Sequence, residues 1–413
     1  PTLVQYVKRY VQSANFFSDR NSISDRVFFF GRTMFLHQLS QELSRYENIG
    51  LFGLRKSGKT SILNQIGFML REHPVVRIDL QQYSSKRYGN KLFKNIISQL
   101  YYLTDRKFKQ ENPEFFSFGP DIPATEITSD FVEKVSVLAE NLEASGMNSP
   151  IICILDEIER ILPSASDSLE RVKEYNSCMG ALRVLSQQRK NLVLLVADVH
   201  PDCNRINQWS QNGVDSNPVF NFFKEVFIPS FEAEETADML TTIAKLMGIG
   251  ISRELAVEIH NESGGHPFVS RQIANIIVQN SNGDTCEVHT PVTDKYWEDM
   301  LLEYEKLANY FEESVWKDLK KRDFHAAILI LKILATTNSI PLEIKSSQLL
   351  TAIKSNLSQM ELRKAITWLI RVGLIQKKRN DTQETLYRAL LPHIFRWIRM
   401  QLDDEELKRC LLI

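Results

Sequence analysis

Residues 53–60 read Gly-Leu-Arg-Lys-Ser-Gly-Lys-Thr and match the pattern G-x-x-x-x-G-K-[ST] at every fixed position. An apolar stretch at 49–52 precedes them and predicts a strand, and apolar residues recur with helical spacing over 61–70. In this strand, loop and helix order, glycines let the chain curl so that successive N–H groups point inward, and the following helix adds the positive end of its dipole. The sequence therefore predicts a phosphate-binding loop.

The predicted loop gives roles to individual residues. Lys59 is expected to reach the β- and γ-phosphates of a nucleotide, and the Thr60 hydroxyl to bind Mg²⁺. The expected cofactors are ATP or ADP and Mg²⁺. Ser61 falls in the first turn of the following helix. The residues expected around the nucleotide phosphates are Gly53, Leu54, Arg55, Lys56, Ser57, Gly58, Lys59, Thr60 and Ser61.

A second apolar run, at 151–155, ends in two acidic residues, Asp156 and Glu157. A short uninterrupted apolar run predicts a strand that is buried on both faces. We expect Asp156 to hold Mg²⁺ together with Thr60, and Glu157 to orient and deprotonate the attacking water. The plainer interpretation is that two acids merely end a core strand, but the nearby phosphate loop favours hydrolysis.

Apolar runs at 75–80 and 191–197 predict two more buried strands, and three stretches between the strands have helical spacing. We expect residues 220–228 to form the last strand, or a short helix that runs into that strand. Alternating strands and helices predict an α/β fold with a parallel sheet covered on both faces. Ligands of such sheets bind beyond the carboxyl ends of the strands, where both motifs lie. The three helical stretches are 92–102, 127–144 and 169–189.

The tip of the strand at 191–197 is polar. Asp198 and His200 are candidates for contact with the γ-phosphate or the attacking water, and capping of the loop is the alternative. Four arginines are candidates to stabilise charge in the transition state, in cis or across a subunit boundary, and the sequence does not choose among them. They are Arg160, Arg183, Arg189 and Arg205.

Two further segments resemble the AAA+-related ATPases of the STAND class and their archaeal and bacterial relatives. Phe29-Phe30-Gly31-Arg32 resembles the F-x-G-R segment of that class, and residues 262–268 (ESGGHPF) resemble the G-x-P element of its helical domain. The resemblance implies that Gly31 and Arg32 lie near the base or ribose, and that Pro267 closes over the base. From the residues alone, Gly-Gly-His-Pro is a turn between helices.

The same resemblance implies that His393 contacts the β-phosphate, whereas a buried core histidine is the alternative. Many members of the class carry an arginine at the strand tip where this chain has Ala197-Asp198-Val199-His200. The arginine finger of ring-forming AAA+ proteins has no clear counterpart either. The sequence therefore leaves both the γ-phosphate sensor and assembly into a ring open.

The expected organisation has five parts: an N-terminal helical extension at 1–26, a P-loop α/β domain at 27–230, a helical lid at 231–320, a winged helix at 321–400 and a tail at 401–413. Helical spacing predicts the lid. Three helical stretches and a hairpin, with strands at 374–378 and 385–389 around a polar turn, predict the winged helix. Its helices are expected at 324–335, 347–354 and 359–372.

The winged-helix segment is basic. Residues 321–400 hold 14 Lys and Arg against 5 Asp and Glu, whereas the whole chain has a net charge of −1. Six basic residues of this segment could bind DNA phosphates. Winged helices of the STAND class also pack on the nucleotide domain, so the fold alone does not imply DNA binding. The six residues are Arg363, Lys364 and Arg371 on the third helix and Lys377, Lys378 and Arg379 on the hairpin.

Composition excludes several classes of protein. Among 413 residues, 43% are hydrophobic and 24% charged, which is typical of globular proteins and not of disordered or fibrous ones. The five cysteines are scattered and form no C-x-x-C pair, so we expect a reducing, cytoplasmic location. No apolar run approaches the roughly 20 residues that span a bilayer. The first residue is Pro1, which suggests excision from a longer chain.

These observations favour an ATP-binding, ATP-hydrolysing switch of the AAA+/STAND type. Nucleotide state would rearrange the lid and winged helix and so control an unidentified partner or effector. The chain could form a homo-oligomer. The resemblance to the STAND class implies sensing, in defence or signalling, as the leading biological role. The alternative is a DNA-binding ATPase that resembles origin-recognition or transposition regulators. A third hypothesis is an almost inactive scaffold that keeps ADP bound for structure.

Overall fold

The computed structural model describes residues 15–18, 22–23, 25–83, 87–115, 123–163, 167–199, 222–280, 285–286, 305–321, 324–337, 342–353, 358–379 and 383–403. Contacts divide the chain into two compact units. The sheet unit comprises residues 33–53 and 59–227, and the C-terminal unit comprises 1–32, 54–58 and 228–413. The candidates His200 and Arg205, most of the predicted N-terminal extension and most of the tail lie outside the described residues.

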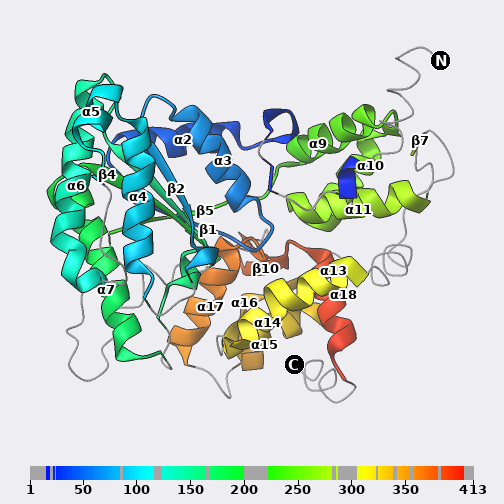
Figure 1. The fold of residues 1–413 in the computed structure, drawn as a ribbon. Coiled ribbons are helices and arrows are strands. Elements are labelled where there is room, and N and C mark those ends of the chain that lie inside the picture. Colours follow the sequence, from blue (N-terminus) through cyan, green and yellow to red (C-terminus); the bar gives the residue numbers. More distant parts are fainter. Residues whose placement is uncertain are drawn as a thin grey trace, which may run out of the picture. The chain divides into compact units, whose positions relative to one another are not determined.

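The sheet unit alternates strands and helices (Figure 1). Its strands are β1 (Ile49–Phe52), β2 (Val75–Asp79), β3 (Ile151–Asp156), β4 (Leu192–Asp198) and β5 (Lys224–Phe227). Its α-helices are α2 (Thr33–Ser44), α3 (Lys59–Met69), α4 (Gly89–Leu103), α5 (Arg106–Glu111), α6 (Ala124–Ala144) and α7 (Leu169–Arg183). Shorter helical turns are η3 (Leu80–Gln82), η4 (Ile158–Arg160) and the π-helical η5 (Val184–Gln188), which extends α7.

The five strands form one sheet in the order β2-β3-β4-β1-β5, and every pairing is parallel. This confirms the predicted parallel α/β sheet. Strand β4 lies between the strand that leads into the phosphate loop and the strand that ends in Asp156. Because the strands run in one direction, their carboxyl ends share one edge, and Asp79 and Asp156 are register partners there.

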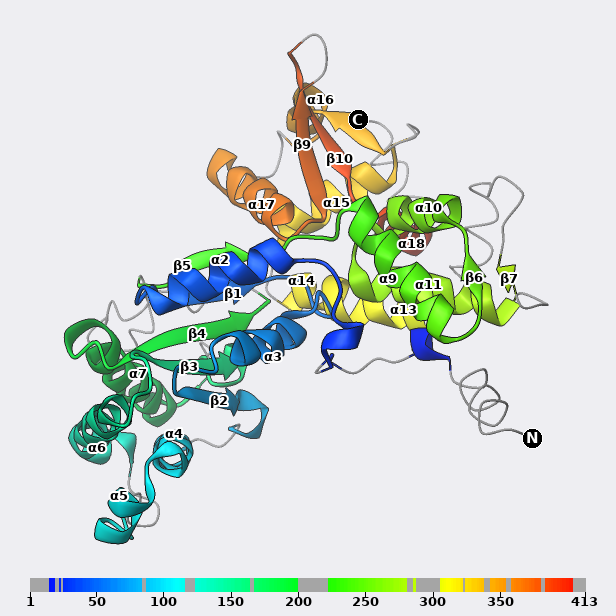
Figure 2. The ribbon, with the colours of Figure 1, turned by 90° about the horizontal axis from the view of Figure 1, so that it is seen from above.

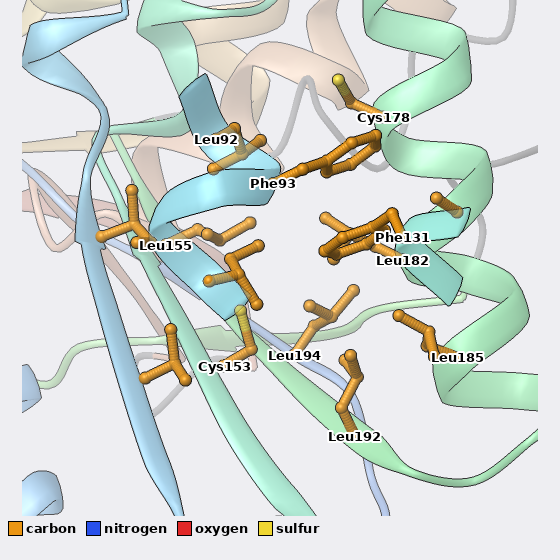
Figure 3. Close-up of a cluster of buried hydrophobic side chains, with 14 of the residues drawn as sticks. Leu92, Phe93, Phe131, Cys153, Leu155, Cys178, Leu182, Leu185, Leu192 and Leu194 are labelled. Atoms are coloured by element: carbon orange, nitrogen blue, oxygen red, sulfur yellow. The ribbon is translucent and has the colours of Figure 1, made fainter. Parts of the chain in front are cut away.

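The strands are apolar because both of their faces are covered: every residue of β1, β3 and β4 is buried. One face packs on α4, α6 and α7, with Cys153, Leu155 and Leu194 in that layer (Figure 3). Phe93 of α4 stacks on Phe131 of α6 with ring centroids 3.8 Å apart. Helices α2 and α3 lie on the other face (Figure 2).

One buried carboxylate joins the helices of this layer. Glu174 of α7 accepts hydrogen bonds from Gly89 N at 2.7 Å and from Ala124 N at 3.1 Å, the first residues of α4 and α6. A negative charge at a helix N-terminus is stabilising. Gly89 permits this approach, because a Cβ there would lie 2.5 Å from the Ala124 Cβ.

The C-terminal unit begins with the short turns η1 (Phe16–Ser18) and η2 (Arg26–Phe28). Its middle part contains α9 (Ala233–Leu246), β6 (Gly250–Ile251), α10 (Arg253–Ser263), α11 (Pro267–Asn280), β7 (Thr285–Cys286), α13 (Glu305–Phe311), the π-helical η6 (Glu312–Trp316) and α14 (Lys317–Lys321). Its last part contains α15 (His325–Ala335), β8 (Glu343–Lys345), α16 (Ser346–Ile353), α17 (Gln359–Arg371), β9 (Ile375–Arg379), β10 (Thr385–Ala389) and α18 (Pro392–Gln401).

The last part holds the three helices and the hairpin that the sequence predicts, and two elements that it does not. Strand β8 adds to the hairpin, so that an antiparallel sheet forms in the order β8-β10-β9, and α18 follows β10. In the sheet unit, the sequence also leaves α5 unpredicted; this helix begins where the Asp105 side chain accepts a hydrogen bond from Phe108 N. Among the described residues, every helix is too short or too polar to cross a membrane.

Candidate functional site: a phosphate loop and two acidic strand ends

The predicted phosphate loop connects β1 to α3. Two of its residues, Lys56 and Gly58, have left-handed backbones, with φ of 60° and 97°. Alternation of right- and left-handed residues turns neighbouring N–H groups to one side and makes a concave anion-binding nest. The Lys59 Nζ donates to the Gly53 carbonyl at 2.8 Å, across the base of the loop. Ser61 is buried in the first turn of α3.

Thr60 and Asp156 lie together in the sheet unit. Asp156 ends β3, is buried, and forms a side-chain hydrogen bond with Thr60. Burial raises the pKa of the Asp156 carboxyl, and the Thr60 hydrogen bond and the Arg77 guanidinium, 3.7 Å away, oppose that rise. A hydroxyl and a carboxylate are ligands that Mg²⁺ prefers, with waters and phosphates completing its shell. The two residues therefore fit a magnesium ion.

The part of the chain that the structure describes contains no group of three or more His, Cys, Asp or Glu that could hold a metal ion.

Glu157 follows Asp156 with a left-handed backbone, φ 56° and ψ 51°. A non-glycine residue in this region is strained by about 1–3 kcal/mol, and such strain clusters at functional sites. Both carboxylate oxygens are held: Gln81 Nε2 donates to Oε1 at 2.9 Å, and Arg160 Nε donates to Oε2 at 3.1 Å. Of the candidate arginines that the structure describes, Arg160 alone is placed on this carboxylate.

Gln81 is a residue that the sequence analysis missed. It lies in the turn η3 directly after β2, where the Asp79 carboxylate accepts a hydrogen bond from the Gln81 main chain at 3.0 Å. An aspartate two residues before a glutamine at a strand end could have indicated the turn. The partner Glu157 is 76 residues away, so no local pattern points to the contact.

The other candidates at the edge of the sheet have structural partners. The Asp198 carbonyl accepts a hydrogen bond from Gly53 N at 3.3 Å, and its buried carboxylate accepts one from Val199 N. Asp198 therefore ties the tip of β4 to the start of the phosphate loop. Arg183 donates to Gln187, and Arg189 lies 3.9 Å from Glu133.

Gly31 and Arg32 belong to the C-terminal unit, as does the loop tip at 54–58. Both have left-handed backbones, and the Glu235 carboxylate accepts a hydrogen bond from Arg32 N at 2.7 Å. Arg32 Nη1 donates to the Ser57 carbonyl at 2.7 Å, and its guanidinium lies over the Phe231 ring. Burial lowers the pKa of Arg32 to about 10, against the opposing effect of Glu235, so the side chain stays charged at neutral pH. The structure thus places Arg32 on the main chain of the loop tip.

Pro267 is the first residue of α11. The turn before it uses two glycines with left-handed backbones, Gly264 and Gly265. A Cβ on Gly264 would lie 1.9 Å from the Leu390 carbonyl oxygen, so only glycine fits this approach.

The Walker-type ATPase PABY2304 of Pyrococcus abyssi is a structural neighbour with a TM-score of 0.58, over 93% of this chain and 99% of that one, at 15% sequence identity. The chain therefore has the same fold as this Walker-type ATPase. Two other solved structures are also similar. ORC2 of Aeropyrum pernix has a TM-score of 0.49 at 14% identity, over 98% of this chain and 99% of that one. RuvB of Thermotoga maritima has a TM-score of 0.38 at 12% identity, over 88% of this chain and 94% of that one. No protein-family model matches the sequence, and no curated protein matches it significantly.

His393 lies on α18 and faces α10, within the C-terminal unit. Its Nε2 is 3.5 Å from Glu262 Oε2, and both oxygens of Glu262 also accept hydrogen bonds from Arg396. Burial and the neighbouring Arg396 lower the pKa of His393 to about 3, so the imidazole is neutral near pH 7. The structure places His393 at a packed contact between two helices of the C-terminal unit.

The basic residues of the last part lie on an exposed face. Arg363, Lys364, Thr367 and Arg371 of α17 are exposed, and their spacing puts them on one side of the helix with Met360. On β9, Lys377 and Arg379 are exposed and Lys378 is half-buried.

Proposed function

We propose that this chain is a Mg²⁺-dependent ATPase that works as a nucleotide-controlled switch. The observation that carries the proposal is the hydrogen bond between Thr60 and the buried Asp156. Thr60 directly follows Lys59 in the loop that matches the phosphate-binding pattern. The fold it shares with a Walker-type ATPase supports the same conclusion.

Each residue then has a chemical task. Main-chain N–H groups of the loop and the Lys59 ammonium bind the phosphates, and Thr60 and Asp156 hold the magnesium. Magnesium, when bound, neutralises charge that develops on the phosphate oxygens. Glu157 accepts a proton from the attacking water.

Gln81 and Arg160 each take one acceptor site of the Glu157 carboxylate, one on each oxygen. They fix its orientation and compete with a water for it, although a carboxylate has about four such sites. We therefore propose a slow basal rate, with Gln81 and Arg160 as the groups through which an unidentified partner or effector releases hydrolysis.

Contacts of the loop tip support the switch. Arg55 and Ser57 of the tip form hydrogen bonds with Tyr310 and Arg32 of the C-terminal unit, which also contains the helices expected to respond to nucleotide. A ligand can shift a conformational equilibrium only through contacts that differ between the states. A nucleotide that moved the loop tip would change these hydrogen bonds, and its binding would then be coupled to the C-terminal unit. We include a role in defence or signalling in the proposal.

Removal of metal tests the proposal. We expect phosphate release from ATP with Mg²⁺ present, and a loss of at least about 100-fold with excess EDTA, because the ion stabilises the transferred phosphoryl group by several kcal/mol. Asp156→Asn should raise the Mg²⁺ concentration needed for half-maximal turnover, whereas the matched surface change Asp130→Asn should leave it unchanged. Turnover that is equal with and without EDTA would refute a magnesium-dependent mechanism.

The exposed basic face of α17 and β9 favours a second candidate, a DNA-binding ATPase. Arg363, Lys364 and Arg371 protrude from one side of a helix long enough to lie in a major groove.

Charge reversal tests this second candidate. Lys377→Glu, Lys378→Glu and Arg379→Glu together should weaken duplex binding about tenfold or more, and lower the salt dependence of log K by about 1 for each phosphate that is no longer neutralised. The control is Lys107→Glu, an exposed lysine of the sheet unit. Fluorescence anisotropy of a labelled duplex between about 50 and 200 mM salt is the measurement. Binding that both variants retain equally would exclude β9 as the DNA-binding surface, and the same measurement on Arg363→Glu, Lys364→Glu and Arg371→Glu together tests α17.

A further inference from the structure

The loop tip adopts its shape with a lysine at one of its left-handed positions. Lys56 has φ 60°, a backbone conformation that glycine adopts readily and that a residue with a Cβ adopts at a cost in free energy. Gly58, with φ 97°, is the other left-handed residue of the tip. The tip supports this conformation in part itself, because Ser57 N donates to the Leu54 carbonyl at 3.2 Å across the turn. Side chains outside the tip add to that support.

The carbonyl groups just before these two residues are both held by side chains of the C-terminal unit. Tyr310 Oη donates to the Arg55 carbonyl at 2.9 Å, and Arg32 Nη1 donates to the Ser57 carbonyl at 2.7 Å. In a planar trans peptide the C=O and the following N–H point in opposite directions. Fixing these carbonyls therefore aims the N–H groups of Lys56 and Gly58 away from Tyr310 and Arg32, and N–H groups are what a phosphate loop offers its ligand.

Tyr310 is itself oriented by a histidine. Val269 N donates to His266 Nδ1 at 3.5 Å, and the tautomer that fits this contact carries its ring proton on Nε2, which lies 3.0 Å from Tyr310 Oη. The consistent set of donors runs from Val269 to His266, from His266 to Tyr310, and from Tyr310 to the Arg55 carbonyl. Burial raises the pKa of the Tyr310 hydroxyl, which keeps its proton available for donation.

The Tyr310 ring is packed among aromatic side chains. Phe268 and Phe311 lie with their ring centroids 5.1 Å and 5.4 Å from that of Tyr310, and Phe311 also contacts Trp397 of α18 at 6.5 Å. The Lys56 ammonium lies over the Phe268 ring at 5.9 Å. The hydroxyl that holds the loop tip is thus fixed by α11, α13 and α18, all within the C-terminal unit.

We propose that Tyr310, oriented by His266, is a positioning residue of the phosphate loop. Together with the Ser57–Leu54 hydrogen bond of the tip, it fixes the peptide between Arg55 and Lys56 and helps to keep Lys56 left-handed without a glycine. It thereby makes nucleotide affinity depend on the packing of the C-terminal unit. This inference rests on the proposed function, since it requires nucleotide to bind at the loop.

Tyr310→Phe is the decisive variant, because it keeps the ring and removes only the hydroxyl. Its binding of a fluorescent ATP analogue with Mg²⁺ should be roughly tenfold weaker than that of wild type, since a carbonyl and a histidine donor lose their buried partner. The matched control is Tyr101→Phe, another buried tyrosine whose hydroxyl donates to main-chain carbonyls, those of Lys109 and Asn112 in the sheet unit. It should change thermal stability without changing affinity. Equal affinity in wild type, Tyr310→Phe and Tyr101→Phe would overturn the inference.

Two double variants separate positioning from a merely structural role. In a Lys56→Gly background, where the left-handed backbone no longer needs support, Tyr310→Phe should weaken binding less than about twofold. His266→Phe should weaken binding in the same direction as Tyr310→Phe, with no further loss when the two are combined. Losses that simply add in either pair would overturn the inference. If the wild type itself binds no nucleotide, the proposed function fails, a result distinct from a wild type that binds and a Tyr310→Phe variant that binds equally well.

Discussion

Glu157→Gln should leave ATP bound to the protein and slow its hydrolysis by roughly 10²–10⁴-fold. The amide keeps the size of the side chain and can still accept a hydrogen bond from Gln81, but it cannot take a proton from water. Phosphate release under single-turnover conditions gives the rate, and the nucleotide content of the purified protein, measured by chromatography, gives the occupancy. We expect ATP rather than ADP in the variant.

Glu159→Gln is the matched control for this change. Glu159 lies two residues after Glu157, in η4, carries the same negative charge as Glu157, and has no role in the proposed mechanism. Its turnover should equal that of the wild type. If Glu157→Gln hydrolyses ATP as fast as Glu159→Gln does, then Glu157 is not the proton acceptor, and the held carboxylate seen here has a structural role only.

Lys59→Ala should weaken ATP binding about 100-fold. The ammonium is expected to contact two phosphates through charge-assisted hydrogen bonds, which contribute roughly 1.5–3 kcal/mol each, and a tenfold change in affinity corresponds to about 1.4 kcal/mol. The substitution also removes the hydrogen bond to the Gly53 carbonyl, which braces the base of the loop. Isothermal titration calorimetry with a non-hydrolysable ATP analogue measures the loss directly.

The control for Lys59 is Lys91→Ala, on α4, whose ammonium lies over the Tyr83 ring. Its affinity for the analogue should match the wild type. Nucleotide that binds Lys59→Ala as tightly as it binds Lys91→Ala would mean that the phosphate-binding pattern is not the nucleotide site of this protein.

The sheet was predictable from the sequence because buried parallel strands are uninterrupted apolar runs. Strands β1, β3 and β4 lie within a residue of their predicted limits, since each is bounded by polar residues at the edge of the sheet. Strand β8 was missed because its three residues, Glu-Ile-Lys, have no pattern of their own and pair through β10. Helix α18 was missed because the segment that contains Pro392 and His393 was interpreted as a motif, whereas a helix begins there.

The candidate site was predictable only where it is local in the sequence. The loop pattern placed Lys59 and Thr60, and the acidic strand end placed Asp156, and the structure brings these residues of the sheet unit together. The partners that hold the site, Gln81 on Glu157 and Tyr310 on Arg55, are separated by 76 and 255 residues from what they contact. Such contacts are set by tertiary packing, which spacing along a chain does not report.

The carboxylate of Glu174, which fixes the first residues of α4 and α6, has a consequence for how this protein can change. The segment between the end of α4 and the start of α6 joins two helices whose positions on the sheet are already secured by one side chain. The first residues of α4 and α6 therefore do not depend on that segment for their anchoring. An insertion at Asp130, an exposed site elsewhere on α6, and one in the segment itself would differ in whether they disturb the contacts that Phe108 and Phe115 make with the core.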